Sequence, residues 1–186
     1  MKRALDLVLV LLALAVLAVP MALVALLVRC TSKGPALYWS DRVGRDNAIF
    51  RMPKFRSMRV DTPAVATHLL VDPARYLSPV GSLLRKTSLD ELPQLWSILR
   101  GDMSFVGPRP ALFNQHDLIA MRTERGVHRL VPGLTGWAQI NGRDELPMAT
   151  KVELDSYYLK HQSLALDLRI LWRTAIQVVR RDGIVH

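Results

Sequence analysis

The sequence predicts an α+β protein that is attached to a membrane. The chain opens with an apolar run long enough to enter a bilayer, two short segments flank a turn early in the chain, and two long segments near its end have helical periodicity. We therefore expect a re-entrant membrane helix–break–helix in residues 1–33. A small, mostly helical domain in residues 34–186 should follow, with a short β-hairpin and amphipathic interfacial helices.

Length, charge and composition limit the classes of partner. A chain of 186 residues suits one domain plus a membrane element. The net charge of +9 favours anionic partners, namely phospholipid surfaces, nucleic acid or phosphorylated substrates. Aromatic residues make up only 6% of the chain and no nucleic-acid recognition motif is present, which argues against nucleic acid. The single Cys30 excludes an internal disulfide, and the histidines have no metal-ligand spacing.

The apolar run, residues 7–28, contains no charged side chain. At about 1.5 Å per residue, a helix of this length just crosses a hydrocarbon core of roughly 30 Å. The run is long for a signal peptide and no cleavage site follows it. A spanning helix fits the length, and a re-entrant hairpin fits as well because Pro20 would break the run in its second half.

The charges around this run favour the hairpin over the span. Lys2 and Arg3 precede it, and Arg29 and Lys33 follow it. Because positive flanks tend to stay in the cytoplasm, both ends are drawn to the same side of the membrane. We expect a hairpin broken near Pro20, although prolines are also tolerated in spanning helices.

The remaining elements follow in order along the chain. Residues 36–40 and 48–52 surround the turn-rich residues 41–47 and predict a β-hairpin. Three prolines in residues 61–79 predict a loop with a short helix. Glycine and proline punctuate a further loop at residues 101–110, and helices are predicted for residues 111–125, 148–161 and 164–181.

The last of these helices is amphipathic and basic. One helical stripe is apolar and another is cationic; the apolar members are Leu164, Leu168, Leu171, Ala175 and Val178, and the cationic ones are Arg169, Arg173 and Arg180. This pattern suits a membrane surface, and it suits equally a helix packed on the core with a solvated basic face.

The acidic pair Asp90–Glu91 lies among cations in the middle of the chain. With Ser88 as N-cap, Glu91 completes a capping box, and the two acids then have only a structural role. If Pro93 is instead the first helical residue, both acids precede the helix. Arg109, between two prolines, has a restricted backbone that suits a pre-positioned guanidinium.

A glycine-rich segment follows this loop. Three glycines in residues 132–143 permit close backbone approach, and Asn141–Gly142 is a turn signal that presents Arg143. The segment matches neither a P-loop nor a dinucleotide-binding fingerprint.

Five motifs occur in an order that resembles one family, the bacterial sugar transferases, whose small members are monotopic phosphoglycosyl transferases. The motifs are KFRSM (54–58), RKTSLDELPQ (85–94), GDMS (101–104), VGPRP (106–110) and PGLTGWAQINGR (132–143). The resemblance covers nearly the whole chain. The extra N-terminal membrane domain of larger members is not in this sequence, and we expect a minimal catalytic unit.

The resemblance implies an enzyme that transfers a sugar 1-phosphate from a UDP-sugar to polyprenyl (undecaprenyl) phosphate. UMP is released, and a covalent aspartyl sugar-phosphate forms in ping-pong fashion, as the first membrane step of surface glycan (exopolysaccharide or glycoconjugate) assembly. On the matching positions, Asp90 is the nucleophile and a ligand of Mg²⁺, and Glu91 is its catalytic partner. The cations expected to bind substrate are Lys54, Arg56, Arg85, Arg109 and Arg143.

The resemblance also implies a location and partners. We expect a monotopic protein of the bacterial inner (cytoplasmic) membrane, with its catalytic domain on the cytoplasmic face. The partners would be the UDP-sugar, polyprenyl phosphate and the phospholipid bilayer, and no nucleic acid; the oligomeric state, a homo-oligomer included, is left open. The alternatives are a membrane-anchored nucleic-acid-binding module and a scaffold in which Asp90 and Glu91 only cap a helix. One departure weakens the hairpin: Val19 stands before Pro20, where the family frequently has serine.

Overall fold

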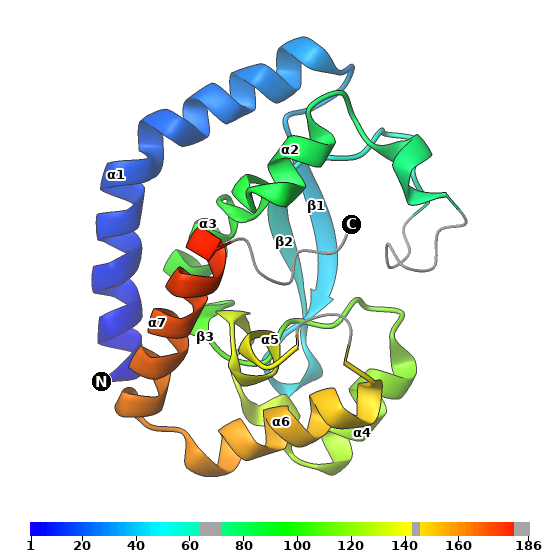
Figure 1. Ribbon diagram of the computed structural model, residues 1–186. Helices are drawn as coiled ribbons and strands as arrows, with labels where there is room; N and C mark the ends of the chain where they lie inside the picture. Colours follow the sequence, from blue (N-terminus) through cyan, green and yellow to red (C-terminus); the bar gives the residue numbers. More distant parts are fainter. Residues whose placement is uncertain (64–71, 143–145, 181–186) are drawn as a thin grey trace.

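The computed structural model describes residues 1–63, 72–142 and 146–180, which form helices and two small sheets. The long helix α1 (Lys2–Thr31) borders one side of the molecule, and the hairpin of β1 and β2 lies near the centre (Figure 1). In that view, the helices of residues 81–100 lie to the left of the hairpin and those of residues 116–161 lie below it.

Helix α1 is apolar and long enough to cross a membrane by length and composition. The chain remains helical through Pro20, so the expected break is a bend within a continuous helix, visible in Figure 1. A proline lacks the backbone N–H and clashes with the carbonyl one turn earlier, and it therefore bends a helix without having to end it.

The first turns of α1 are bound to the rest of the protein by charged side chains. Lys2 pairs with Asp167 at 2.7 Å, and the Arg3 guanidinium donates to backbone carbonyls at the end of α3 (Gln94–Arg100). The buried Asp6 carboxylate accepts from the hydroxyl of Ser104 and the backbone N–H of Phe105, both at 3.0 Å. The N-terminal end of α1 is therefore docked on the folded domain.

The rest of α1 is docked along one face. Val10 lies in a core cluster with Met52 and Ile98, and Val28 lies in a second cluster with Phe55. The opposite face is apolar and exposed; it includes Val8, Leu11, Leu12, Val16, Val19, Leu23 and Leu26. Both ends of α1 thus contact the same folded body, and a broad apolar surface remains on its outer side.

The predicted β-hairpin is confirmed, with longer strands than expected. Strand β1 (Leu37–Val43) pairs antiparallel with β2 (Ile49–Phe55), and Leu37 lies opposite Phe55. A 3₁₀ turn joins them, with positive φ angles at Asp46 and Asn47, which are residue types that tolerate the left-handed region.

A second sheet was not predicted. Strands β3 (Ser104–Val106) and β4 (Gly133–Thr135) are parallel; β3 comes from the segment that we expected to be a loop, and β4 comes from the glycine-rich segment that follows it. A Cβ at Gly133 would collide with the backbone of Gly107, so the close approach of these segments requires glycine.

The remaining α-helices are α2 (Gly81–Lys86), α3 (Gln94–Arg100), α4 (His116–Glu124), α5 (Trp137–Ile140), α6 (Met148–His161) and α7 (Leu164–Arg180). Three of them, α4, α6 and α7, correspond to predicted ranges, whereas no helix range was predicted for α2, α3 or α5. The prediction for α6 is confirmed at both ends, whereas α4 begins several residues later than predicted. Of the predicted loop with a short helix, residues 72–79 contain the 3₁₀ helix Pro73–Tyr76, and residues 64–71 lie outside the described part.

Helix α7 packs through a face other than its predicted apolar stripe. Asp167 and Ile170 are buried, while Leu164 and Leu168 are exposed and Trp172 is 70% exposed. Most of the apolar stripe therefore faces outward, beside exposed Arg169 and Arg173, whereas its member Leu171 packs against the core.

Candidate active site

The acidic pair lies in a 3₁₀ turn, Leu89–Glu91, between α2 and α3. Ser88 has a left-handed backbone (φ 55°) and its side chain makes no capping hydrogen bond, so the capping-box interpretation is wrong. Helix α3 begins at Gln94, one residue after Pro93, and the alternative in which both acids precede the helix is therefore nearly right. The carboxylates of Asp90 and Glu91 do not cap α3.

Glu91 is held by two cations from distant parts of the chain. Its Oε1 accepts from Lys54 Nζ at 2.8 Å and from Arg109 Nη2 at 3.0 Å. Lys54 lies on β2, and Arg109 lies on the loop that follows β3. Burial raises the pKa of Glu91, but Lys54 and Arg109 together hold it well below its usual range, so Glu91 is ionised at neutral pH.

The pKa of Asp90 is shifted in the opposite direction. It is 7% exposed, and burial raises its pKa to about 6; Lys54 opposes this shift, Glu91 adds to it, and Arg85 and Arg109 oppose it. Two adjacent carboxyl groups thus have widely separated pKa values, a pattern that occurs where acids have different chemical tasks. An ionised Asp90 in this cation-rich, poorly hydrated place is a competent nucleophile.

The other predicted cations lie in different places. Arg85 is at the end of α2, near enough to Asp90 to lower its pKa. Arg56 is 5% exposed and donates from Nη2 to the carbonyl and hydroxyl oxygens of Ser32, the residue that ends α1. The structure thus brings Lys54, Arg85 and Arg109 to the acidic pair and attaches Arg56 to α1. Arg143 lies outside the described residues.

Two arginines that sequence analysis missed support the Arg109 loop. Arg122 Nη1 donates to the carbonyl of Arg109 at 2.8 Å, and Arg42 Nη1 donates to the carbonyl of Pro110 at 3.1 Å. The backbone N–H of Gly133 donates to the carbonyl of Pro108 at 2.9 Å. The two prolines were the available signal, because a Pro–Arg–Pro loop offers carbonyls without matching N–H groups and needs donors from elsewhere.

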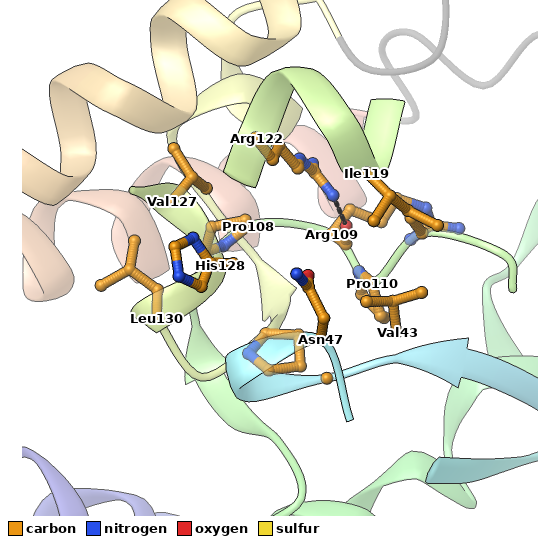
Figure 2. Close-up of a pocket in the computed structure, with 13 residues that line it drawn as sticks. Val43, Asn47, Pro108, Arg109, Pro110, Ile119, Arg122, Val127, His128 and Leu130 are labelled. Carbon is orange, nitrogen blue, oxygen red and sulfur yellow. Dashed lines mark hydrogen bonds between the residues drawn. The ribbon is translucent and has the colours of Figure 1, made fainter. Parts of the chain in front are cut away.

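This loop also lines a pocket of about 350 Å³, a volume that includes the open space at its mouth (Figure 2). Its walls are mostly apolar and include Val43, Ile119 and Val127, with the His128 ring and the Arg122 side chain between them. Neither Asp90 nor Glu91 lines it. Of the two residues that bind Glu91, Arg109 also lines the pocket and Lys54 does not.

The donor set fits a magnesium ion that is carried by substrate. Within residues 1–63, 72–142 and 146–180, no cluster of three or more His, Cys, Asp or Glu side chains is placed to hold a metal. Mg²⁺ is commonly bound by one or two carboxylates, with substrate phosphates and water completing the octahedron. Asp90 can supply such a carboxylate, whereas Glu91 is already engaged by Lys54 and Arg109.

The sequence of this chain matches a family model and several known proteins. A model described as bacterial sugar transferase matches residues 1–181. The undecaprenyl-phosphate galactose phosphotransferase of Salmonella typhimurium is 41% identical over 81% of this chain and 34% of its own length. The UDP-glucose:undecaprenyl-phosphate glucose-1-phosphate transferase of Escherichia coli is 38% identical over 95% of this chain and 40% of its own length. The exopolysaccharide production protein ExoY of Sinorhizobium fredii is 38% identical over 98% of this chain and 87% of its own length.

The extent of these matches differs among the relatives. The chain spans between a third and two fifths of the Salmonella and Escherichia coli proteins, and nearly the whole of the Sinorhizobium protein. The names of the first two describe the transfer of a sugar phosphate to undecaprenyl phosphate; the sugar is galactose in the first name and glucose in the second.

Proposed function

Because the chain belongs to the bacterial sugar transferase family, we propose that it transfers a sugar 1-phosphate from a UDP-sugar to undecaprenyl phosphate. UMP is released and the product is undecaprenyl-diphosphate-sugar, the starting lipid for a surface glycan. Relatives at 38–41% identity carry names that describe this class of reaction. The observation that carries the proposal is the buried Asp90 beside a Glu91 that is fixed by Lys54 and Arg109.

The reaction proceeds in two displacements. A carboxylate oxygen of Asp90 attacks the β-phosphorus of the UDP-sugar, the bond to the bridging oxygen breaks, and UMP leaves with the electron pair. A phosphate oxygen of undecaprenyl phosphate then attacks the same phosphorus, and Asp90 departs as a carboxylate. Covalent catalysis of this kind divides one difficult displacement into two easier ones.

Attack by an anion on a diphosphate requires positive charge around the transferring group. Lys54, Arg85 and Arg109 lie at the acidic pair and supply it. Glu91 holds Lys54 and Arg109 in place and remains ionised, while Asp90 releases its proton near pH 6. Arg143, which the family resemblance matches to a phosphate-binding position, completes the cation set in this proposal, and Arg56 stays a proposed substrate-binding residue at the end of α1.

Mg²⁺ is the proposed cofactor. Asp90 would be its protein ligand, and a bound ion would neutralise the diphosphate during transfer. Chelation by EDTA should therefore stop UMP release.

We propose that the protein is attached to the cytoplasmic face of the inner membrane, and the arrangement of α1 supports the monotopic character of this attachment. Lys2, Arg3 and Asp6 at its start and Val28 near its end all contact the same folded body. A helix that crossed the bilayer would have its two ends on opposite sides, about 30 Å of hydrocarbon apart. The exposed apolar face of α1 and the outward stripe of α7 supply surfaces for the lipid.

A panel of UDP-sugars tests the proposal. UDP-galactose, UDP-glucose and UDP-N-acetylgalactosamine are incubated with enzyme and Mg²⁺, first without undecaprenyl phosphate. The effective donor should release at most one UMP per active site, and the peptide that contains Asp90 should gain the mass of one sugar phosphate. Addition of undecaprenyl phosphate should then give continuous turnover. UMP release that strictly requires the acceptor would refute the covalent route, and no release from any donor would refute the transferase function.

A further inference from the structure

Arg122 and Asp155 form an ion pair behind the loop that carries Arg109. Arg122 Nε and Nη2 both donate to Oδ2 of Asp155, at 3.0 and 2.6 Å. The side chain of Arg122 is 12% exposed and that of Asp155 is 1% exposed. The third nitrogen, Nη1, is thereby directed at the carbonyl of Arg109, 2.8 Å away (Figure 2). The carboxylate on α6 thus orients the guanidinium on α4 that holds the loop.

This carbonyl is an effective point at which to fix Arg109. The peptide bond that follows it belongs to Pro110 and has no N–H, and a residue before proline has a restricted backbone. Fixing the carbonyl therefore fixes the peptide plane next to the Cα atom that carries the Arg109 side chain. At its other end, that side chain donates to Glu91 at 3.0 Å.

We propose that Arg122, oriented by Asp155, is a positioning residue that sets the Arg109 guanidinium against Glu91. Arg122 contacts the backbone of Arg109 and none of the described catalytic carboxylates. Its effect on the reaction passes through Arg109, which faces the transferring phosphate. A displacement of about 1 Å at such a group costs up to about 100-fold in rate.

A purely structural role makes a different prediction. The ion pair would then only hold α4 against α6, its loss would weaken the whole fold, and the effect on rate would be the same whether or not Arg109 is present. A double-mutant cycle separates these two roles because it isolates the coupling between two side chains.

The experiment uses Arg122→Lys and Asp155→Asn, each in the wild-type and the Arg109→Ala backgrounds. Lysine keeps the charge but cannot bind both Asp155 and the Arg109 carbonyl with a planar fork. Single-turnover UMP release at saturating donor should fall about 10- to 100-fold in the wild-type background, with the KM for donor changed much less. In the Arg109→Ala background the same substitutions should cause no further loss. Equal losses in both backgrounds would overturn the proposal.

Asp167→Asn is the matched control. Asp167 is as deeply buried as Asp155, but its partners are Lys2 and Tyr158. This variant should lower the thermal stability, and its effect on rate should add to that of Arg109→Ala. Asp155→Glu, which keeps the carboxylate, should recover part of the rate lost in Asp155→Asn.

The kinetic arm rests on the proposed function, so a second readout is independent of activity. The guanidinium resonances of Arg109 are assigned in ¹⁵N NMR spectra by their loss in Arg109→Ala. Arg122→Lys and Asp155→Asn should shift or broaden them, and Asp167→Asn should leave them unchanged. If the wild-type protein releases no UMP from any donor, the transferase function fails while these resonances still test the positioning role. Unchanged resonances in both variants would overturn it.

Discussion

Asp90 and Glu91 are neighbours in the chain, yet their carboxyl groups shift in opposite directions. Glu91 Oε1 is bound directly by two cations, whereas Asp90 is 7% exposed and burial dominates its pKa. The two pKa values differ because the two side chains have different neighbours in the folded protein. The adjacent positions of Asp90 and Glu91 in the sequence do not reveal these neighbours.

Replacement of Asp90, the proposed nucleophile, should separate activity from stability. Asp90→Asn should lower turnover by at least about 10³-fold, because an amide is a far poorer nucleophile of nearly the same shape. Continuous UMP release in the presence of undecaprenyl phosphate measures this. Near-wild-type turnover, in a preparation checked by mass spectrometry for deamidation, would exclude Asp90 as the nucleophile.

The same variant has a predictable effect on stability. The pKa of Asp90 is about 6 in the folded protein and near 3.8 when unfolded, so the folded state binds the proton more tightly. The contribution of Asp90 to wild-type stability therefore decreases as the pH rises from about 4 to about 6 and then levels off. Asp90→Asn lacks this loss, and above pH 6 it should equal or exceed the wild-type free energy of unfolding, by up to about 3 kcal/mol. Thermal melts from pH 4 to 8 test this, and a gap that widens on acidification would contradict it.

The rate of the first displacement should follow the ionisation of Asp90. Single-turnover UMP release should rise about tenfold per pH unit below pH 6 and become constant above it, because only the carboxylate attacks phosphorus. Stopped reactions between pH 5 and 8 measure this profile. A flat profile through pH 6 would show that ionisation of Asp90 does not limit the step.

Sequence analysis identified the residues that touch the acidic pair but not those that support them. Lys54 and Arg109 lie in compact motifs, and the structure brings both to Glu91. Arg122 and Asp155 lie on two helices and belong to none of the five motifs, and only the tertiary packing of α4 on α6 brings them together. A contact of this kind leaves no spacing in the sequence.

Among the secondary-structure elements, a long helix was predicted accurately and the shortest strands were not. Helix α6 was predicted at both ends because fourteen residues carry enough periodicity. Strands β3 and β4 have three residues each, too few to show alternation, and they pair only because Gly107 and Gly133 allow close approach. The bend of α1 was anticipated from Pro20, but the continuity of the helix through it was not.

The bend at Pro20 should be needed for both ends of α1 to dock. Pro20→Leu restores a helical hydrogen bond and should straighten α1, so that the contacts of Lys2 and of Val28 cannot both be kept. We expect at least about a tenfold fall in UMP release together with a lower melting temperature. Val19→Leu, at the exposed neighbouring position, is the control and should resemble the wild type. A fully active, equally stable Pro20→Leu protein would show that the bend is dispensable.

At the scale of the whole molecule, the central prediction concerns the side of the membrane on which the N-terminus lies. A cysteine is inserted between Met1 and Lys2 in a Cys30→Ser background, because Cys30 is itself exposed. With both ends of α1 on the cytoplasmic side, a membrane-impermeant thiol reagent should label this cysteine in lysed cells and leave it unlabelled in intact cells. Labelling from outside would mean that α1 spans the bilayer.

The ion pair between Lys2 and Asp167 has a consequence for the order of folding. The two residues are separated by 165 positions, so α1 leaves the ribosome long before its partner on α7 has been made. Contacts of such high sequence separation form late, and chains are built from the N-terminus onward. The contact between Lys2 and Asp167 can therefore form only after every element between α1 and α7 has been made.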